Sequence, residues 1–379
     1  MTFNKIQINQ QLFEETSHSP ALADMVGEEM IGQVSDFCFI ANPYYPTKNM
    51  MKKLIAKIPG IIKNYPSSNP RLAQENLARV LKVDPEHLII GNGATELITL
   101  IGRELVSRIA IPVPTFSEYL EKLSSADCAL LYQLPPADNY RLKLEDFAEW
   151  IDKHHLPAAL IINPGNPTGQ FIPKADMLSF LKRMSHLKLI LVDESFIDFS
   201  GIENPGLMPQ VSDFPNLLIV RSMSKHCGVP GLRLGYCCTA NTEFARLLRQ
   251  LLPVWNINTI AESFLTMLPD TDDDYQKSVN RIVRDMKRLY RELSQIPGLK
   301  VYPTGSNFIL LKVEFGMTAR NLQYRLLSDF GVYVRDCSNK VGLDKFHIRV
   351  ASQGRKKDRH LTDALRILSE EALNHSSLP

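Results

Sequence analysis

The segment Arg221-Ser222-Met223-Ser224-Lys225-His226 is the most informative part of the chain, and the glycine-rich run Gly228 to Gly235 follows it. The segment comes directly after an apolar run that is typical of a buried strand. Lys225 thus stands at a strand end among small and apolar residues, where desolvation lowers the pKa of an amine and suits it to imine formation. Ser222, Ser224 and Arg233 supply hydroxyl and bidentate donors for a phosphate. We expect His226 to be a packed side chain, with a proton carrier as the alternative.

Apolar runs on both sides of this segment indicate an α/β fold. Six of them predict buried strands: His87–Asn92, Arg108–Val113, Ala158–Asn163, Leu187–Asp193, Asn216–Arg221 and Leu234–Thr239. Helical periodicity appears between them, at Thr95–Leu105 and at Lys174–His186. Strands that alternate with helices predict a mostly parallel central sheet with right-handed crossovers.

The pattern changes after about Pro253. A long charged helix is predicted at Asp272–Gln295 and further helices near Thr318–Phe330 and Lys356–Leu373, with strands at Asn307–Val313, Val332–Arg335 and Phe346–Val350. This order is typical of a small α+β domain. We therefore expect an N-terminal arm and small-domain segment at 1–45, a large domain at 46–255 and a small C-terminal domain at 256–379.

Two glycine-containing segments also follow predicted strands. Gly91-Asn92-Gly93-Ala94-Thr95-Glu96 leads into a helix, whose N-terminal amides form an anion site, although a tight turn without a ligand is as common. Asn163-Pro164-Gly165-Asn166-Pro167-Thr168-Gly169 contains two Asn-Pro steps that force a rigid irregular loop. Ligands of open α/β sheets bind at such carboxyl ends of strands.

Asp193 ends an otherwise apolar strand, in Val192-Asp193-Glu194-Ser195-Phe196. A buried acid is costly unless it meets a cation, and a protonated pyridine nitrogen is such a cation. A helix cap is the alternative for Asp193. Glu194 is expected to be structural.

Composition excludes several classes of function. The net charge of +2 gives no indication of nucleic-acid or membrane binding. No apolar run reaches the roughly 20 residues that span a bilayer. The six cysteines include no C-x-x-C pair and no dense framework, and we expect buried free thiols in a cytoplasmic protein. Cys227, two residues after Lys225, is expected to be structural.

Taken together, these motifs resemble fold-type I enzymes that depend on pyridoxal 5′-phosphate (PLP), the aspartate aminotransferase superfamily. Within it the chain is similar to histidinol-phosphate aminotransferases and, more closely, to threonine-phosphate decarboxylases. The decarboxylase pattern is carried by Asp193 to Phe199, by Val229-Pro230-Gly231-Leu232-Arg233 and by Arg335-Asp336-Cys337-Ser338 through Gly342-Leu343.

The resemblance implies a role for each matching residue. Lys225 would hold PLP as a Schiff base, Asp193 would pair with the pyridine nitrogen, Asn166 would contact the phenolic oxygen and Phe116 would stack on the ring. Ala94, Thr95, Ser222, Ser224 and Arg233 would bind the cofactor phosphate, and Tyr65 would reach the phosphate of the neighbouring subunit in a homodimer with shared active sites. Arg349 would bind the substrate carboxylate, and Arg335 would be a second anchor for substrate anions.

Three features depart from the resembled families. Phe196 stands where the aminotransferases carry a tyrosine, and the decarboxylases tolerate phenylalanine there. Residues 1–30 lack the His-Gly-Gly-Asn loop that binds the substrate phosphate in those decarboxylases, and Ala41-Asn42-Pro43-Tyr44-Tyr45 also differs from their segment. We expect an enzyme acting at the α-carbon of an amino acid, with α-decarboxylation favoured, transamination as the alternative and a non-catalytic PLP-binding regulator as a remote one.

Overall fold

A computed structural model describes residues 5–14, 20–123 and 128–376 of the chain. Its main sheet has seven strands in the order β2-β8-β7-β6-β5-β3-β4. They span Leu88–Asn92 (β2), Ile109–Val113 (β3), Ala129–Gln133 (β4), Ala158–Ile162 (β5), Leu189–Asp193 (β6), Leu217–Ser222 (β7) and Leu234–Cys238 (β8). Only β8 runs antiparallel to its neighbours, which confirms the mostly parallel sheet.

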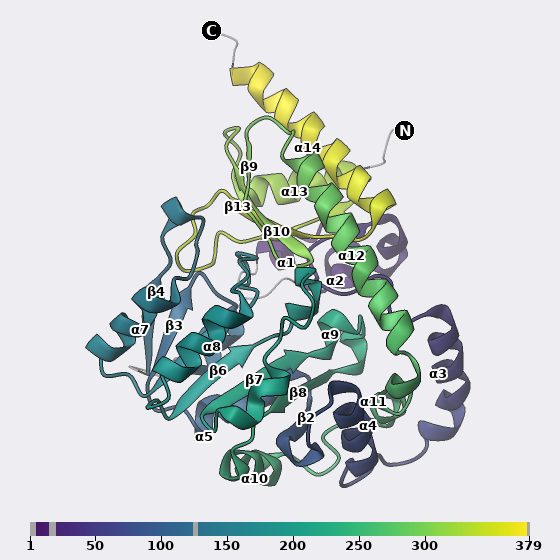
Figure 1. Ribbon diagram of the computed structural model, residues 1–379. Coiled ribbons are helices and arrows are strands. Elements are labelled where there is room, and N and C mark those ends of the chain that lie inside the picture. The colour runs from purple at the N-terminus through teal and green to yellow at the C-terminus, as the bar shows by residue number, and fades with distance from the viewer. Residues whose placement is uncertain (1–4, 15–19, 124–127, 377–379) are drawn as a thin grey trace.

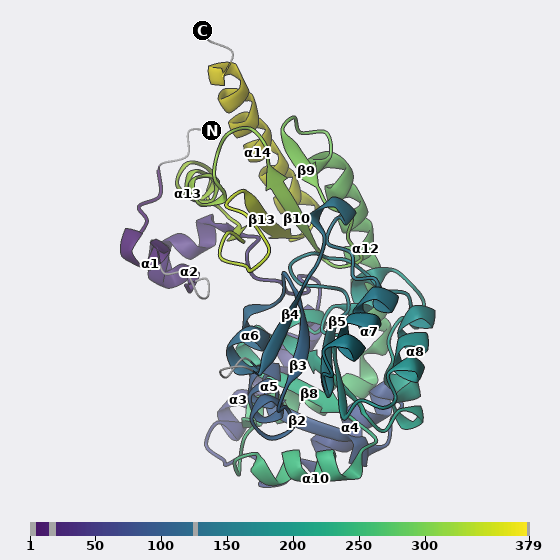
Figure 2. The same cartoon turned by 90° about the vertical axis from the view of Figure 1, so that its left-hand side faces the viewer.

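Helices cover both faces of this sheet (Figures 1 and 2). Alternate residues of each strand enter different cores, so that Ile161 packs on one face and Leu160 on the other. This two-sided burial is why the strands are continuously apolar. One core contains residues of α3 (Lys48–Ile61), α4 (Arg71–Leu81), α7 (Leu144–Lys153), α8 (Lys174–Arg183) and α11 (Thr259–Leu265). The other contains residues of α5 (Ala94–Glu104), α6 (Ser117–Leu123) and α10 (Thr242–Leu251).

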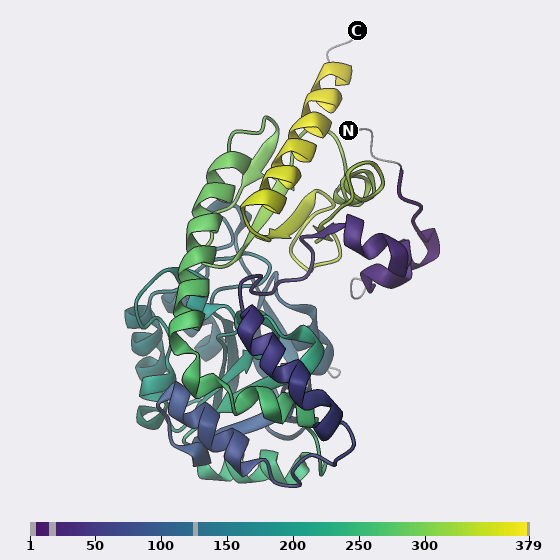
Figure 3. The same cartoon turned by 90° about the vertical axis from the view of Figure 1, so that its right-hand side faces the viewer.

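A second, antiparallel sheet forms the smaller part of the molecule, in the order β12-β13-β10-β9. Its strands are β9 (Leu299–Val301), β10 (Phe308–Val313), β12 (Arg335–Asp336) and β13 (His347–Ala351). Residues of α12 (Asp272–Leu293), α13 (Ala319–Phe330) and α14 (Arg355–Ser376) complete its core. The long α12 lies beside α14 and extends down over the large domain (Figure 3).

The N-terminal arm joins this smaller part. Strand β1 (Ser35–Asp36) pairs in parallel with β11 (Val332–Tyr333), and the short helices α1 (Gln10–Glu14) and α2 (Leu22–Val26) lie beside α13 (Figure 2). The single strand predicted at Val332–Arg335 is thus two short strands, β11 and β12, in different sheets.

The expected domain boundaries stay a prediction. Helix α11 and the residues up to Leu268 pack into the core of the large sheet, beyond the expected boundary at 255. Residues 1–4 of the arm and 377–379 of the small domain lie outside the described residues. In the part of the chain that the structure describes, no helix has the length and apolar character needed to cross a membrane.

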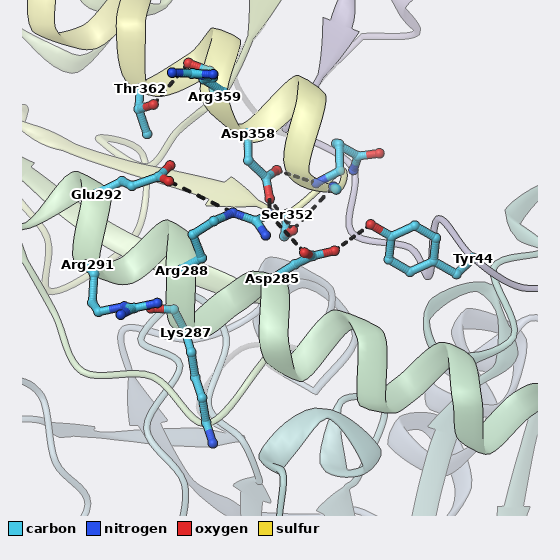
Figure 4. Close-up of polar contacts among 12 residues, drawn as sticks. Tyr44, Asp285, Lys287, Arg288, Arg291, Glu292, Ser352, Asp358, Arg359 and Thr362 are labelled. Carbon is cyan, nitrogen blue, oxygen red and sulfur yellow. Dashed lines mark hydrogen bonds and ion pairs between the residues drawn. The ribbon is translucent and has the colours of Figure 1, made fainter.

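A buried polar network fixes the junction between the arm and the two long helices (Figure 4). Asp358 at the start of α14 accepts hydrogen bonds from Ser352 Oγ at 2.7 Å and from the Gln353 amide at 2.8 Å. Arg288 of α12 forms an ion pair with Asp285 at 2.8 Å and lies 3.6 Å from Asp358. The hydroxyl of Tyr44 donates to Asp285. The segment that enters the large domain is thereby anchored to both helices of the small one.

Candidate active site

Lys225 lies on the one-turn helix α9 (Met223–His226), directly after β7. Burial lowers the pKa of its amine to about 8, and the positive charge of Arg349 acts in the same direction. The Lys225 carbonyl accepts a hydrogen bond from the Asn42 amide at 2.8 Å, which fixes the backbone of this turn. The site therefore holds an amine that is about half neutral near pH 8, where an ordinary lysine is almost fully protonated.

Asp193 ends the neighbouring strand β6, and its side chain is 6% exposed. Its Oδ1 accepts from the Ser195 amide at 2.8 Å, and its Oδ2 accepts from the Tyr119 hydroxyl at 2.8 Å. Burial nevertheless raises the pKa of this carboxyl above its ordinary value. A cation placed against it would relieve that cost, as the pyridinium of PLP would.

The residues expected to bind a phosphate lie where β2 and β7 end and the antiparallel β8 begins. Strand register places Asn92 opposite Leu234, and Ser222 opposite Gly235. A side chain at Gly93, where φ is +78°, would come within 2.7 Å of Arg233 Nη2, so the guanidinium passes directly over the turn that begins α5. Ala94 and Thr95 open that helix, and their amides form its positive end.

Ser224 gives the plainest sign that an anion belongs there. Its Oγ is buried and has no hydrogen-bond partner among the described residues, a state that costs free energy unless a ligand satisfies the hydroxyl. Ser222 donates its amide to Ser195 Oγ at 2.9 Å. The orphaned hydroxyl, Arg233 and the helix terminus together fit the phosphate of PLP.

Asn166 and Arg349 meet across the two domains. Arg349 on β13 donates from Nη1 to Asn166 Oδ1 at 2.8 Å and from Nη2 to the Cys38 carbonyl at 2.7 Å. Its Nε is buried and has no hydrogen-bond partner within the described residues. Arg335 on β12 is directly opposite Arg349 in register, so both side chains emerge on one face of the small sheet. This face can bind a substrate with more than one anionic group.

Two aromatic side chains lie close to this group. Phe116 follows β3 and its ring centroid lies 6.3 Å from that of Tyr119, the partner of Asp193. Phe196 is buried, follows Asp193 by three residues and packs edge-on against Phe308 at 5.0 Å. The Arg349 guanidinium lies 5.5 Å from the centroid of the same Phe308 ring.

Tyr65 is separate from the buried set. Its side chain is 79% exposed, and its ring lies 4.7 Å from that of Trp255. A residue meant to reach a neighbouring subunit has to be exposed in a single chain, and Tyr65 is. The dimer role stays a prediction.

Three polar residues near Lys225 have structural partners. Glu194 accepts from the Leu207 amide at 2.7 Å, and Arg221 forms an ion pair with Asp198, which also accepts from Tyr275 at 2.6 Å. Burial lowers the pKa of His226 to about 4, so its ring is neutral at neutral pH and packs against Tyr236 and Tyr275. The six cysteines are free and buried, Cys227 among them.

Tyr119 is the residue near the site that the sequence motifs do not indicate. Its contact with Asp193 joins positions 74 residues apart, and nothing in the local pattern of α6 distinguishes it from an ordinary core aromatic.

Comparisons with known proteins identify the family of the chain. Residues 33–365 match the model of the family "Aminotransferase class I and II". The chain is 32% identical to L-serine phosphate decarboxylase of Campylobacter jejuni, over 89% of each chain. It is 33% identical to CMP-5′-(3-aminopropyl)phosphonate synthase of Streptomyces rubellomurinus over 88% of this chain, which spans only 52% of that protein.

Solved structures show the same fold. A decarboxylase from Sulfurospirillum multivorans superposes with a TM-score of 0.84 at 29% identity, covering 94% of this chain and 93% of that one. Histidinol-phosphate aminotransferase from Clostridium acetobutylicum gives a TM-score of 0.81 at 28% identity, covering 89% and 99%. The fold-type I architecture and the similarity to both enzyme groups are thereby confirmed. The chain belongs to the class I and II aminotransferase family and is a PLP-dependent enzyme.

Proposed function

We propose that this enzyme removes the α-carboxylate of a short L-amino acid that carries a phosphate, with O-phospho-L-serine and O-phospho-L-threonine as the first candidates. The observation that carries the proposal is the pair Arg349 and Arg335, directly opposite each other on neighbouring strands, because such a pair suits a substrate with two anions. Phosphoserine decarboxylases are among the relatives, which supports this choice of substrate.

Each candidate site residue receives the role that its position suits. Lys225 would bind the cofactor covalently, Asp193 would pair with its ring nitrogen, Asn166 would donate from Nδ2 to the phenolic oxygen, and Phe116 would cover the ring. Ala94, Thr95, Ser222, Ser224 and Arg233 would bind the cofactor phosphate. When bound, PLP supplies an electron-withdrawing ring that stabilises negative charge at the α-carbon.

The side chains would then direct the reaction. Arg349, held by Asn166 and the Cys38 carbonyl, would orient the substrate carboxylate with its Nε and Nη2 donors. As the carboxylate leaves as CO2, the Lys225 ammonium would give a proton to the α-carbon, and the product would be an amine. An amine with a pKa of about 8 can both carry and release this proton near neutral pH.

We also propose a homodimer with shared active sites and a cytoplasmic location. The exposed ring of Tyr65 supports the first, because it is free to reach a second chain. The absence of disulfides among the described cysteines, all of them buried, is in keeping with a reducing compartment.

Transamination is the second candidate, because histidinol-phosphate aminotransferases are also among the similar proteins. In that case Arg349 would bind the carboxylate of an oxo-acid acceptor. Phe196 disfavours this alternative, since it removes the hydroxyl that the resembled aminotransferases carry at this position.

One experiment separates the two reactions. The holoenzyme is incubated with O-phospho-L-serine, O-phospho-L-threonine, L-serine and L-histidinol phosphate, each with and without 2-oxoglutarate, while CO2 and glutamate are measured together. We expect CO2 from a phosphorylated amino acid without any need for 2-oxoglutarate. Glutamate formation without CO2 would overturn decarboxylation in favour of transamination.

A further inference from the structure

A loop of the small domain, Cys337 to Leu343, closes against the loop that carries Phe116. Gly342 has a φ of +88°, and a side chain there would come within 3.3 Å of Pro114, two residues before Phe116. Leu343 packs with Leu134 and Tyr140 of the large domain. The loop therefore bridges both domains beside the cofactor residues.

Lys340 is the cation that this loop contributes. Its Nζ contacts the hydroxyl of Ser117, the residue directly after Phe116. No carboxylate of the described residues forms a salt bridge with it. Burial, together with the positive charges of Arg335 and Arg349, lowers the pKa of Lys340 to about 8, and Cys337 and Glu121 act in the opposite direction. At neutral pH the Lys340 amine is still mostly in its protonated, ammonium form.

Three cations thus lie close to one another beside the loop that carries Phe116. Arg335 and Arg349 lie opposite each other in register, and both are near enough to Lys340 to act on its titration. Like charges that lie close together favour the binding of an added anion, although Glu121 near Lys340 and Asp36 near Arg349 already supply some negative charge. One carboxylate on Arg349 leaves two cations, and a phosphate monoester with about −1.5 to −2 charges matches them.

We propose that Lys340 is a specificity-determining residue whose ammonium, together with Arg335, binds the terminal phosphate or phosphonate of the substrate. The inference rests on the proposed function and deepens it. Residues 1–30 lack the phosphate-binding loop of the resembled decarboxylases, and Lys340 would offer the phosphate a different contact, from near the other end of the chain. Ser117 holds the ammonium in place until the phosphate arrives.

The test compares Lys340→Gln and Lys340→Arg with the control Lys345→Gln, which removes the same charge from an exposed lysine five residues on. Calorimetry measures the binding of O-phosphoethanolamine and of ethanolamine to each holoenzyme, and kinetics are measured with O-phospho-L-serine. Losing one charged hydrogen bond should raise the Kd for O-phosphoethanolamine and the KM about 10- to 100-fold in Lys340→Gln, with kcat and the cofactor spectrum little changed. Lys340→Arg should restore much of the affinity.

Other outcomes would contradict either the role of Lys340 or the proposed function itself. If Lys340→Gln binds O-phosphoethanolamine as Lys345→Gln does, or if it loses ethanolamine and O-phosphoethanolamine equally, Lys340 does not select the phosphate. If the wild-type enzyme releases CO2 from no phosphorylated amino acid, the proposed function fails as well. If the wild-type enzyme decarboxylates O-phospho-L-serine and Lys340→Gln has the Kd and KM of the wild type, this inference is refuted and the proposed function stands.

Discussion

Arg349→Lys tests the carboxylate site most directly, because it keeps the charge on β13 and removes only the planar fork. In the wild-type chain Nη1 and Nη2 each donate to a protein acceptor, Asn166 Oδ1 at 2.8 Å and the Cys38 carbonyl at 2.7 Å. The buried Nε has no such partner within the described residues. We assign Nε and the second Nη2 hydrogen to the two oxygens of the substrate carboxylate.

The size of the effect follows from counting donors. An arginine has five N–H donors and can serve both protein acceptors and both carboxylate oxygens, which are four acceptors together. A lysine ammonium has three donors, so at least one acceptor loses a charged hydrogen bond. That loss costs about 2–3 kcal/mol, or about 30- to 150-fold in kcat/KM.

The assay is steady-state release of CO2 from O-phospho-L-serine, with the PLP absorbance and the thermal midpoint measured on the same samples. Arg355→Lys, an exposed position at the start of α14, is the matched control and should behave as wild type. Unchanged kinetics in Arg349→Lys would refute the carboxylate assignment. A loss of activity that only follows a loss of PLP or of thermal stability would show that Arg349 is structural.

Three further predictions concern the cofactor, the dimer and the fold. The rate at which cofactor-free protein takes up PLP should rise with pH with a midpoint near 8, because the neutral Lys225 amine is the form that reacts. A midpoint near that of an ordinary lysine, about 10.4, would contradict the lowered pKa. Mixing Tyr65→Phe and Lys225→Ala subunits should restore activity, because a hybrid dimer has one site free of both changes, and a monomer of full activity would exclude sharing. Asp358→Ala should cost about 3 kcal/mol in urea unfolding, because it leaves buried partners unpaired, whereas the exposed Asp363→Ala should cost little.

The interior of the large sheet was predictable because both of its faces are buried. Each of the six strands predicted from apolar runs has a counterpart in the structure, within a residue or two at the ends. Strand β4 was not predicted, although Ala129–Gln133 is mostly apolar; it lies at the sheet edge and is only partly buried. The separation of β11 from β12 also depends on pairing with β1 and β13, which no local pattern reveals.

The residues of the candidate site also fall into two groups, those that the sequence predicted and those that it could not predict. Lys225, Asp193 and Asn166 stand in short motifs at strand ends, where sequence order alone places them near one another. Tyr119 and Lys340 could not be predicted, because their contacts join residues 74 and 223 positions apart and depend on how the domains meet. Lys340 lies within the stretch Arg335 to Leu343 that carries the resemblance. The resemblance assigns no role to Lys340 or to Tyr119.

This division explains why the family was easier to infer than the reaction. The proposed roles of Lys225, Asp193 and the phosphate-binding residues concern the cofactor, and they would be needed equally for decarboxylation and for transamination. The choice between the two reactions depends on which bond to the α-carbon is aligned for cleavage, and the side chains that hold the substrate anions set that alignment. Arg349, Arg335 and Lys340 come from the small domain, whereas their contacts Asn166 and Ser117 come from the large one. We therefore expect reaction and substrate to be determined at the boundary between the domains. Variants such as Arg349→Lys and Lys340→Gln should change substrate binding there without removing any residue assigned to the cofactor.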